Sequence, residues 1–391
     1  MKILHIYDHS YYEKNGLFYS SGVFGKRAWE PYFQVFDNLT ILANLADSNN
    51  ISVESLDISS RSGVGFSFVE NKRLFKNYVK SFFTSDKKLI NCIREHDGVI
   101  IRLPSELGLF AIKEAIKLKK PFAVEVVGCA WDSYWYHGSV KGKLMAYITF
   151  YRMKKALKAA PFAIYVTEYY LQKLYPTNGY SGFASNVVLP DRFDPNVLES
   201  HIQFLEKSKN KLRIGLIGTL NVEYKGHLEA ILALKEIQNL VPDFELVFVG
   251  KGDSTWLEKK IAENGMTEKV IVLGKLSSGN AVFEFLDSLD LYLHPSKHEG
   301  LPRAVIEAMS RACPVLASSV AGTPELLAKD HLHTPGDYLT LSKQIHYVIN
   351  NRELLKKMAK DNFEKSKIYS FSNIKQHKFE FWNKFKTTLF K

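Results

Sequence analysis

The sequence predicts an α/β protein with two doubly wound, Rossmann-like domains that face each other across a cleft. Three observations lead to this prediction. Short apolar runs alternate with stretches of helical spacing, which is the order of βαβ units. The apolar runs are nearly continuous, as in strands that are covered on both faces. With 391 residues, the chain has room for two domains at the usual ~150 residues each.

The first half contains strand-like runs at residues 2–6, 98–101 and 122–127. Between the last two runs, residues 107–118 have the apolar spacing of a helix. Strands that alternate with helices in this way predict a parallel sheet.

The second half repeats the alternation more regularly. Strands are predicted at residues 212–217, 244–249, 270–273, 291–293 and 315–317. Helices are predicted at residues 228–240, 255–264, 281–288 and 301–311. Gly218, Gly250 and Gly274 directly follow the first three strands, at the edge where parallel sheets bind their ligands.

A polar stretch around Pro195 separates the two halves, so the domains are expected at residues 1–195 and 205–372. The segment 373–391 has apolar residues at helical spacing, namely Phe379, Trp382, Phe385 and Leu389. We expect this helix to pack back on the first domain. The alternative is an amphipathic contact with a membrane.

The composition is that of a soluble globular protein, with 46% hydrophobic and 24% charged residues. The three cysteines (Cys92, Cys129 and Cys313) are far apart and form no Cys-x-x-Cys pair, which indicates free thiols in a reducing compartment. No signal peptide and no apolar stretch of ~20 residues is visible in the sequence. A cytoplasmic location is therefore expected.

The net charge of +11 is concentrated in one region. Residues 71–160 contain 18 Lys or Arg and 7 Asp or Glu. Such a region can bind an anionic membrane surface, a phosphorylated substrate or nucleic acid, or can simply be a solvated face. No helix-turn-helix, zinc-finger or RNA-recognition signature accompanies it, which argues against nucleic acid. The basic region suggests peripheral contact with the inner face of the plasma membrane, while a phosphorylated substrate and a solvated face stay open as alternatives.

The segment 294–307 carries the chemistry, because it contains Glu299 and Glu307 eight residues apart. Glu299 ends the loop after a buried strand, and Gly300 and Leu301 lead into a helix whose free backbone N–H groups can bind an anion. A diphosphate could lie at this helix start. Glu307 could then accept hydrogen bonds from two sugar hydroxyls, while Glu299 faces the reacting sugar.

A metal ion is not expected in this segment. His294 and His298 are four residues apart, as in a zinc pair, but Pro295 lies between them and no His-Glu-x-x-His order exists. The chain also lacks an Asp-x-Asp triplet, the usual carboxylate pair for a metal-held nucleotide sugar. The sequence therefore predicts chemistry without a metal or another cofactor.

This segment resembles the E-x7-E motif of the family 4 retaining glycosyltransferases, which have the GT-B fold. The resemblance covers residues 212–350 and includes Gly218-Thr-Leu, Tyr-Lys225-Gly226, Gly250-Lys-Gly252 and Gly322-Thr-Pro-Glu325. In the first half, residues 128–138 and 165–176 resemble a bacterial polysaccharide-assembly subgroup. The resemblance implies a hexosyltransferase that moves a sugar from a nucleoside diphosphate to a glycan or lipid-linked acceptor. The alternatives are an epimerase-like GT-B enzyme and a non-catalytic sugar-nucleotide-binding protein.

The resemblance also implies residue roles. Glu307 would bind the ribose, Glu299 the donor sugar and Lys225 the diphosphate. Three further donor contacts are implied at Gly218, at Thr219, which stands where many members have Arg, and at the backbone near Leu276. Family members often place a first-domain His near the reacting sugar, and the choice here between Asp132 and His137 stays open.

Overall fold

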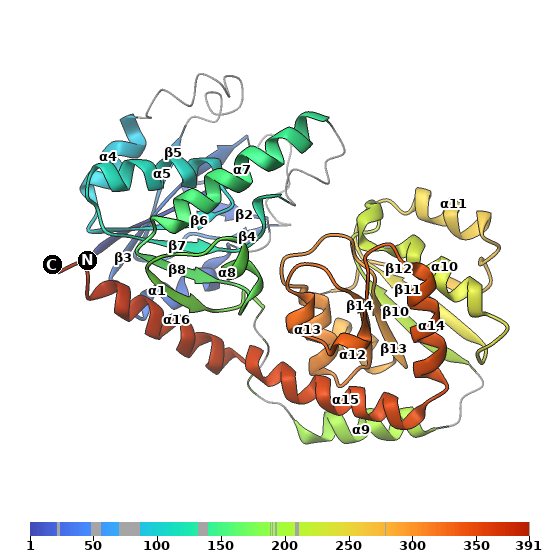
Figure 1. Cartoon of the computed structure of the whole chain (residues 1–391). Helices are drawn as coiled ribbons and strands as arrows, with labels where there is room; N and C mark the ends of the chain where they lie inside the picture. Colours follow the sequence, from blue (N-terminus) through green and yellow to red (C-terminus); the bar gives the residue numbers. More distant parts are fainter. Residues whose placement is uncertain are drawn as a thin grey trace. The chain divides into compact units, whose positions relative to one another are not determined.

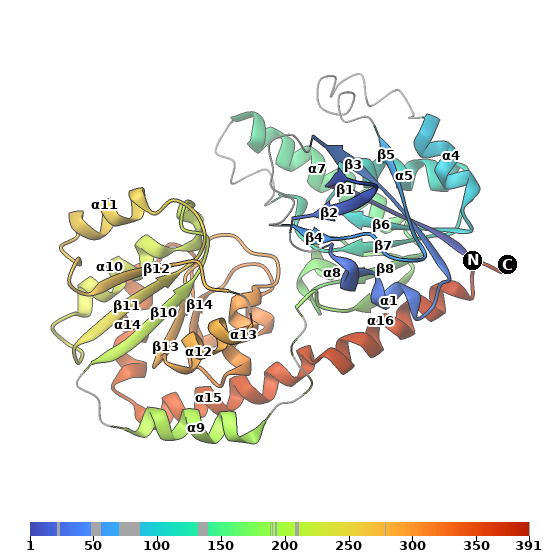
Figure 2. The same cartoon turned by 180° about the vertical axis from the view of Figure 1, so that it is seen from behind.

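The computed structural model describes residues 1–21, 24–47, 56–69, 87–131, 140–187, 189, 191, 194–207, 211–277 and 279–390. The chain divides into two compact units (Figures 1 and 2). Unit 1 comprises Met1–Asn186 and Lys375–Lys391, and unit 2 comprises Val187–Ile374. Each unit is a largely parallel sheet with helices on both faces, so the predicted α/β class is confirmed.

The described residues of unit 1 form a nine-stranded sheet. Its central strand, β1 (Lys2–Lys14), pairs in parallel with β3 on one side and β6 on the other. The parallel strands on the β3 side are β3 (Asn38–Ala46) and β5 (Val64–Val69). Those on the other side are β6 (Gly98–Leu103), β7 (Phe122–Val126), β8 (Phe162–Tyr165) and β9 (Tyr180–Phe183). Two short antiparallel strands complete the sheet, β2 (Leu17–Ser20) and β4 (Asp57–Ile58).

Strand β1 continues well beyond the predicted residues 2–6. The register with β3 shifts between Ile6 and Ser10, and pairing then continues to Tyr12. The far half of β1 also pairs with β2. Backbone pairing on two sides therefore extends the strand through residues that are too polar to read as a strand.

Helices cover both faces of the unit 1 sheet (Figures 1 and 2). One face carries α4 (Lys87–Glu95), α5 (Glu106–Lys117) and α7 (Val140–Lys158). The short helix α8 (Tyr170–Leu174) follows β8, while α1 (Glu30–Phe33) and part of α16 (Phe371–Lys386) pack on the other face. Alternate strand residues such as Leu4 and Ile6 are fully buried in the core under α4 and α5.

Helix α16 brings the end of the described chain onto unit 1. The side chains of Trp382 and Phe385 are fully buried, and Trp382 packs against Tyr32 with ring centroids 5.5 Å apart. Phe381 is buried against Tyr180, whereas Phe379 remains 37% exposed. The apolar face of this helix therefore serves the core of unit 1.

The described residues of unit 2 form a six-stranded parallel sheet in the order β12-β11-β10-β13-β14-β15. Five of its strands lie where the sequence predicts them, within one residue at each end. They are β10 (Leu212–Ile217), β11 (Phe244–Val249), β12 (Val270–Gly274), β13 (Leu291–His294) and β14 (Val315–Ser318). The edge strand β15 (Leu332–His333) was not predicted, because two residues give no readable pattern.

The helices of unit 2 enclose this sheet. One face carries α10 (His227–Ile237), α11 (Thr255–Glu263) and α14 (Tyr338–Ile349), and the other carries α12 (Asn280–Asp287) and α13 (Arg303–Ser310). Helices α9 (Pro195–Glu206) and α15 (Arg352–Ser366) lie side by side. Helix α13 begins two residues later than predicted, because Pro302 is its N-cap.

Two further expectations concern the thiols and the membrane. Cys92, Cys129 and Cys313 are all buried and form no disulfide. Burial also raises the pKa of the Cys313 thiol, which makes it a poor nucleophile. Among the described helices, none combines the length and the apolar content needed to cross a bilayer.

Candidate functional site

The candidate site lies at the carboxyl edge of the unit 2 sheet, where the strand order reverses. From β10 the chain moves outward to β11 and β12, and then returns to the other side of β10 as β13. The loops after β10 and β13 therefore leave the same edge in opposite directions. Such a reversal opens the crevice in which doubly wound sheets bind ligands. The two loops carry Lys225 and Glu299.

The loop after β10 is shaped by close backbone contacts. Gly250 approaches Gly218 so closely that a Cβ on Gly250 would lie 1.7 Å from the Gly218 carbonyl oxygen. Lys225 ends a short 3-10 turn, and Gly226 then adopts a φ of +83° before α10 begins. A Cβ on Gly226 would lie 2.3 Å from the Pro295 carbonyl oxygen. Glycine is thus required after Lys225, both for the left-handed backbone and for contact with the second loop.

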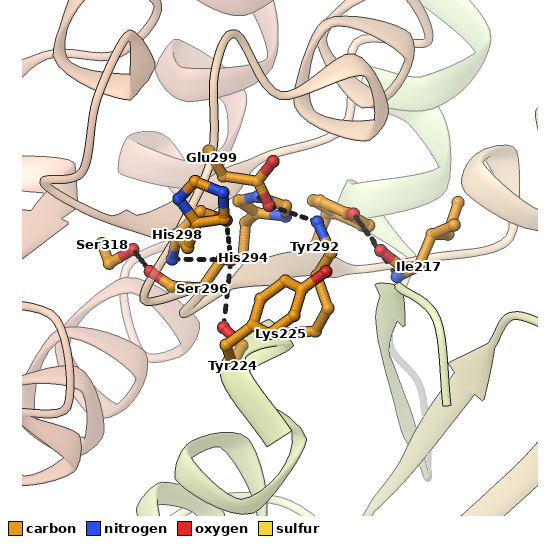
Figure 3. Close-up of polar contacts among 9 residues, drawn as sticks. All are labelled: Ile217, Tyr224, Lys225, Tyr292, His294, Ser296, His298, Glu299 and Ser318. Carbon is orange, nitrogen blue, oxygen red and sulfur yellow. Dashed lines mark hydrogen bonds and ion pairs between the residues drawn. The ribbon is translucent and has the colours of Figure 1, made fainter. Parts of the chain in front are cut away.

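The loop after β13 is attached to the first loop. The Lys297 N–H donates to the Tyr224 carbonyl at 2.7 Å. The Ser296 hydroxyl lies 3.2 Å from the same carbonyl oxygen and 2.9 Å from that of His298 (Figure 3). Lys297 also forms an ion pair with Glu229 of α10. These contacts fix the backbone that leads to Glu299.

Glu299 connects the two loops through one oxygen atom. Its Oε1 lies 2.7 Å from Lys225 Nζ and 2.9 Å from His294 Nε2 (Figure 3). The side chain of Glu299 is only 10% exposed. Burial alone would raise the pKa of Glu299, but His294 and Lys225 outweigh it and lower the pKa from 4.5 to about 2. Glu299 is therefore a carboxylate at neutral pH.

His294 is the residue of this network that sequence reasoning missed. The sequence indicates His294 only as half of a zinc-like pair that Pro295 argues against, whereas its ring contacts Glu299 from the last position of β13. Besides His298, the histidines His227 and His333 lie near the site, and burial lowers the pKa of both to about 4. Both rings are therefore neutral at pH 7. A His at the end of a strand, five residues before Glu299, is the signal that could have indicated the contact.

The start of α13 offers backbone donors next to this network. The N-cap residue Pro302 makes no side-chain cap, so the first-turn N–H groups of the helix are not taken up by a capping side chain. Gly300 and Leu301, which directly precede the N-cap of α13, are partly buried. Glu307 lies on α13 with Oε1 3.2 Å from Arg303 Nε. Burial raises the pKa of Glu307, and Arg303 partly offsets this rise.

The corresponding helix start in unit 1 is already occupied. The unit 1 sheet also reverses at β1, between β3 and β6. There the Asp8 carboxylate accepts from the Leu107 N–H at 3.2 and 3.3 Å, and the Ser105 hydroxyl oxygen accepts from the Gly108 N–H at 2.8 Å. A bound anion would have to displace Asp8 from α5. The uncapped start of α13 is therefore the better anion site of the two.

The remaining predicted donor residues lie along the same carboxyl edge. Gly218 and Thr219 directly follow β10, and a Cβ on Gly218 would lie 3.2 Å from Lys225 Cβ. Leu276 is partly buried in the loop after β12. The structure thus places Gly218 close to Lys225, whereas Leu276 follows β12, two strands away from β10. Asp132 and His137 lie outside the described residues.

Comparison with solved structures identifies the fold. Sucrose-phosphate synthase from Thermosynechococcus elongatus superposes with a TM-score of 0.67 at 15% identity, over 99% of this chain and 100% of its own. HepE from Anabaena, in complex with UDP-glucose, superposes with a TM-score of 0.62 at 18% identity, over 98% of this chain and 100% of its own. The predicted GT-B fold is therefore confirmed.

Sequence comparison identifies the family. The family described as "Glycosyl transferases group 1" matches residues 199–365, a range that contains the whole candidate site. Protein CapJ from Staphylococcus aureus is 33% identical over 96% of this chain and 93% of its own length. The chain belongs to the group 1 glycosyl transferases. It is also similar to the 2-deoxystreptamine glucosyltransferase of Streptomyces kanamyceticus, at 30% identity over 42% of this chain and 45% of that one.

Proposed function

We propose that this glycosyltransferase moves a hexose, with retention of configuration at the anomeric carbon, from a nucleoside diphosphate to a glycan or lipid-linked acceptor in surface polysaccharide assembly. One observation carries the proposal, namely the Lys225–Glu299–His294 network beside the uncapped start of α13. Relatives named for polysaccharide synthesis support it, among them the teichuronic acid protein TuaC of Bacillus subtilis and the amylovoran protein AmsK of Erwinia amylovora.

In this proposal Lys225 and the start of α13 bind the diphosphate. Without substrate, Lys225 is neutralised by Glu299 at 2.7 Å. A diphosphate brings further negative charge to the same ammonium group, and the α13 N–H groups add donors to its oxygens. Gly218 and Thr219 lie beside the phosphates, the backbone at Leu276 contacts the base, and Glu307 turns from Arg303 to the ribose hydroxyls.

Glu299 is proposed to hold the donor sugar. Within the described part of the chain, both of its contacts use Oε1, so Oε2 can accept from sugar hydroxyls. Because His294 and Lys225 keep the carboxylate ionised, it can also stabilise positive charge on the sugar ring as the leaving group departs. Glu299 forms no covalent bond in this mechanism.

The transfer itself is proposed to occur on one face of the sugar. Departure of the nucleoside diphosphate, stabilised by Lys225, leaves an oxocarbenium-like sugar. The acceptor hydroxyl attacks from the leaving-group side, and a phosphate oxygen takes its proton. No metal ion is required in this scheme. Asp132 or His137 is the candidate first-domain residue beside the sugar, and the reaction is placed in the cytoplasm, at the inner membrane face.

A thermal-shift screen over nucleotide sugars tests the donor, because a bound donor stabilises the fold by mass action. We expect one nucleotide sugar to raise the melting temperature of the wild type, and Lys225→Met to lose most of that rise. Lys259→Met, at an exposed position of α11, is the matched control and should keep it. The absence of any rise with all donors would contradict the proposal.

Product analysis by NMR then separates the remaining functions. A retaining transferase joins the sugar to an acceptor with the donor's anomeric configuration. An epimerase-like enzyme changes the donor sugar without an acceptor, and a binding protein leaves it unchanged. Inverted product would overturn the retaining mechanism alone.

A further inference from the structure

Helix α7 has an exposed apolar stripe on the side that faces away from the core. Its inner side is fully buried through residues such as Ala146, Met153 and Leu157. Its outer side carries four large apolar residues at positions i, i+3, i+4 and i+7, and these are Leu144 (63% exposed), Tyr147 (49%), Ile148 (37%) and Tyr151 (65%). Solvent-exposed apolar residues normally occur singly, so a continuous stripe of two turns indicates a contact surface.

The same side of α7 becomes basic after this stripe. Lys154, Lys155 and Lys158 are all exposed and follow Tyr151 over the next two turns. At 100° per residue, these lysines lie in the same ~120° sector as the apolar residues. The sequence of α7 contains six basic residues and no acidic one. Arg152 does not belong to this basic surface, because it forms an ion pair with Glu106 of α5, with Nη1 2.7 Å from Oε2.

Aromatic rings extend the stripe to the side. A hollow of about 270 Å³ is lined mainly by aromatic residues, among them Trp131, Tyr147, Phe150, Tyr151 and Tyr170. Trp131 and Tyr147 meet edge to face with ring centroids 4.4 Å apart. Tyr and Trp are the residues enriched where a protein meets the boundary between lipid headgroups and acyl chains.

We propose that this α7 docking face, comprising Leu144, Tyr147, Ile148, Tyr151, Lys154, Lys155 and Lys158, binds the surface of an anionic lipid bilayer. The occupant must accept apolar side chains and present negative charge along the following two turns. A bilayer with anionic headgroups does both, since the apolar residues enter the headgroup region and the lysines contact lipid phosphates. The inference extends the proposed function, because a lipid-linked acceptor would be presented at such a surface.

Vesicle sedimentation of the full chain tests this inference directly. The probes are vesicles of phosphatidylcholine alone and of phosphatidylcholine with phosphatidylglycerol. A lysine near an anionic surface changes partitioning by roughly fivefold, so K154Q/K155Q/K158Q should weaken binding to anionic vesicles on the order of 100-fold. L144S/Y151S should weaken it by roughly tenfold or more, since both side chains lose apolar burial.

Matched controls separate the α7 docking face from general charge and hydrophobicity. K357Q/K360Q/K365Q removes the same charge from exposed positions of α15. L339S/Y347S removes an equivalent exposed pair from α14, where Leu339 is 49% and Tyr347 64% exposed. Both controls should bind anionic vesicles like the wild type. All of these changes lie on the surface, and circular dichroism with melting curves checks that each variant is folded.

The outcomes are distinct from those of the proposed function. The inference would be overturned if the α7 variants bound anionic vesicles as well as the wild type. It would also be overturned if the control variants on α14 and α15 lost as much binding as the α7 variants, or if the wild type did not bind anionic vesicles. Self-association through this face, lost in the α7 variants, without vesicle binding would overturn it in favour of a second copy. The nucleotide-sugar thermal shift needs no membrane. Its failure alongside α7-dependent vesicle binding would refute the proposed donor chemistry and leave the docking face intact.

Discussion

Replacing Glu299 by Gln isolates the charge of this carboxylate, because Gln keeps its size and one acceptor oxygen. Lys225 Nζ and His294 Nε2 lie 2.7 and 2.9 Å from Oε1 in the native chain. The variant retains both neighbours but leaves Lys225 without its counter-charge. We expect E299Q to destabilise unit 2 and to lose most transfer activity. A nucleoside diphosphate should bind it as well as the wild type or better, since it supplies negative charge to Lys225.

The pKa of Glu299 gives the size of the stability effect. A decrease from 4.5 to about 2 favours the carboxylate in the folded state by about 3 kcal/mol. Because the folded-state pKa is depressed, this stabilisation is fully present above the unfolded-state value and is lost as the pH falls toward 2. The free energy of unfolding should therefore differ between wild type and E299Q by about 3 kcal/mol at pH 7, and by roughly half of that at pH 3.

Urea unfolding at the two pH values, followed by circular dichroism, measures this difference. The control is Glu263→Gln, which breaks a solvent-exposed pair with Lys260 at 2.7 Å and should leave the free energy of unfolding nearly unchanged. Calorimetry with the nucleoside diphosphate of the donor found by thermal shift, together with a transfer assay, completes the comparison. A pH-independent difference, or a loss of nucleoside diphosphate affinity as large as the loss of transfer, would refute the reasoning.

Four other changes test the same site. Lys225→Met should reduce nucleotide affinity roughly 10- to 100-fold by calorimetry, and an unchanged Kd would contradict its role. Gly226→Ala should lower the Tm more than Gly265→Ala. Both glycines have a positive φ, +83° at Gly226 and +68° at Gly265, but a Cβ on Gly226 would clash with Pro295 while one on Gly265 would enter open space. Equal decreases in Tm would exclude an effect of the clash. His294→Leu should raise the pKa of Glu299 in an NMR titration and reduce kcat more than the donor KM, and an unshifted Glu299 would contradict this. Transfer should persist in EDTA, and activity that returns only with Mg²⁺ would argue for a metal.

The sheet of unit 2 could be predicted because its strands are buried on both faces. Residues 212–217 and 244–249 were predicted as strands and match β10 and β11 at both ends. Every residue of β13 and β14 is buried, so these strands are readable as continuous apolar runs.

Unit 1 was less predictable for two physical reasons. Strand β5 has only one fully buried residue, and its pairing with β3 gives no strong apolar pattern. Helix α7 has large apolar residues on its outer side as well as its inner side, so its helical periodicity is blurred. The exposed apolar residues that make α7 difficult to predict from the sequence are the same residues that suggest a contact surface.

The site could be predicted in its parts but not in its connections. The spacing of Glu299 and Glu307 indicated a ligand-binding helix start, and the Lys225–Gly226 pair indicated a phosphate contact. Lys225 and Glu299 are 74 residues apart, and only the strand reversal at β10 brings them to 2.7 Å. The contact between His294 and Glu299 belongs to the same network, and the hydrophobic periodicity of the sequence contains no information about that contact.

The return of the chain to unit 1 constrains the order in which the protein can fold on the ribosome. Trp382 and Phe385, which are fully buried in unit 1, are translated only after the whole of Val187–Ile374. At ~5–20 residues per second, that interval lasts roughly 10 to 40 s. During this time the nascent unit 1 exposes Tyr32 and Phe36, the aromatic partners of Trp382. The domain that is synthesised first is therefore completed last, and it is the one that needs protection from aggregation during translation.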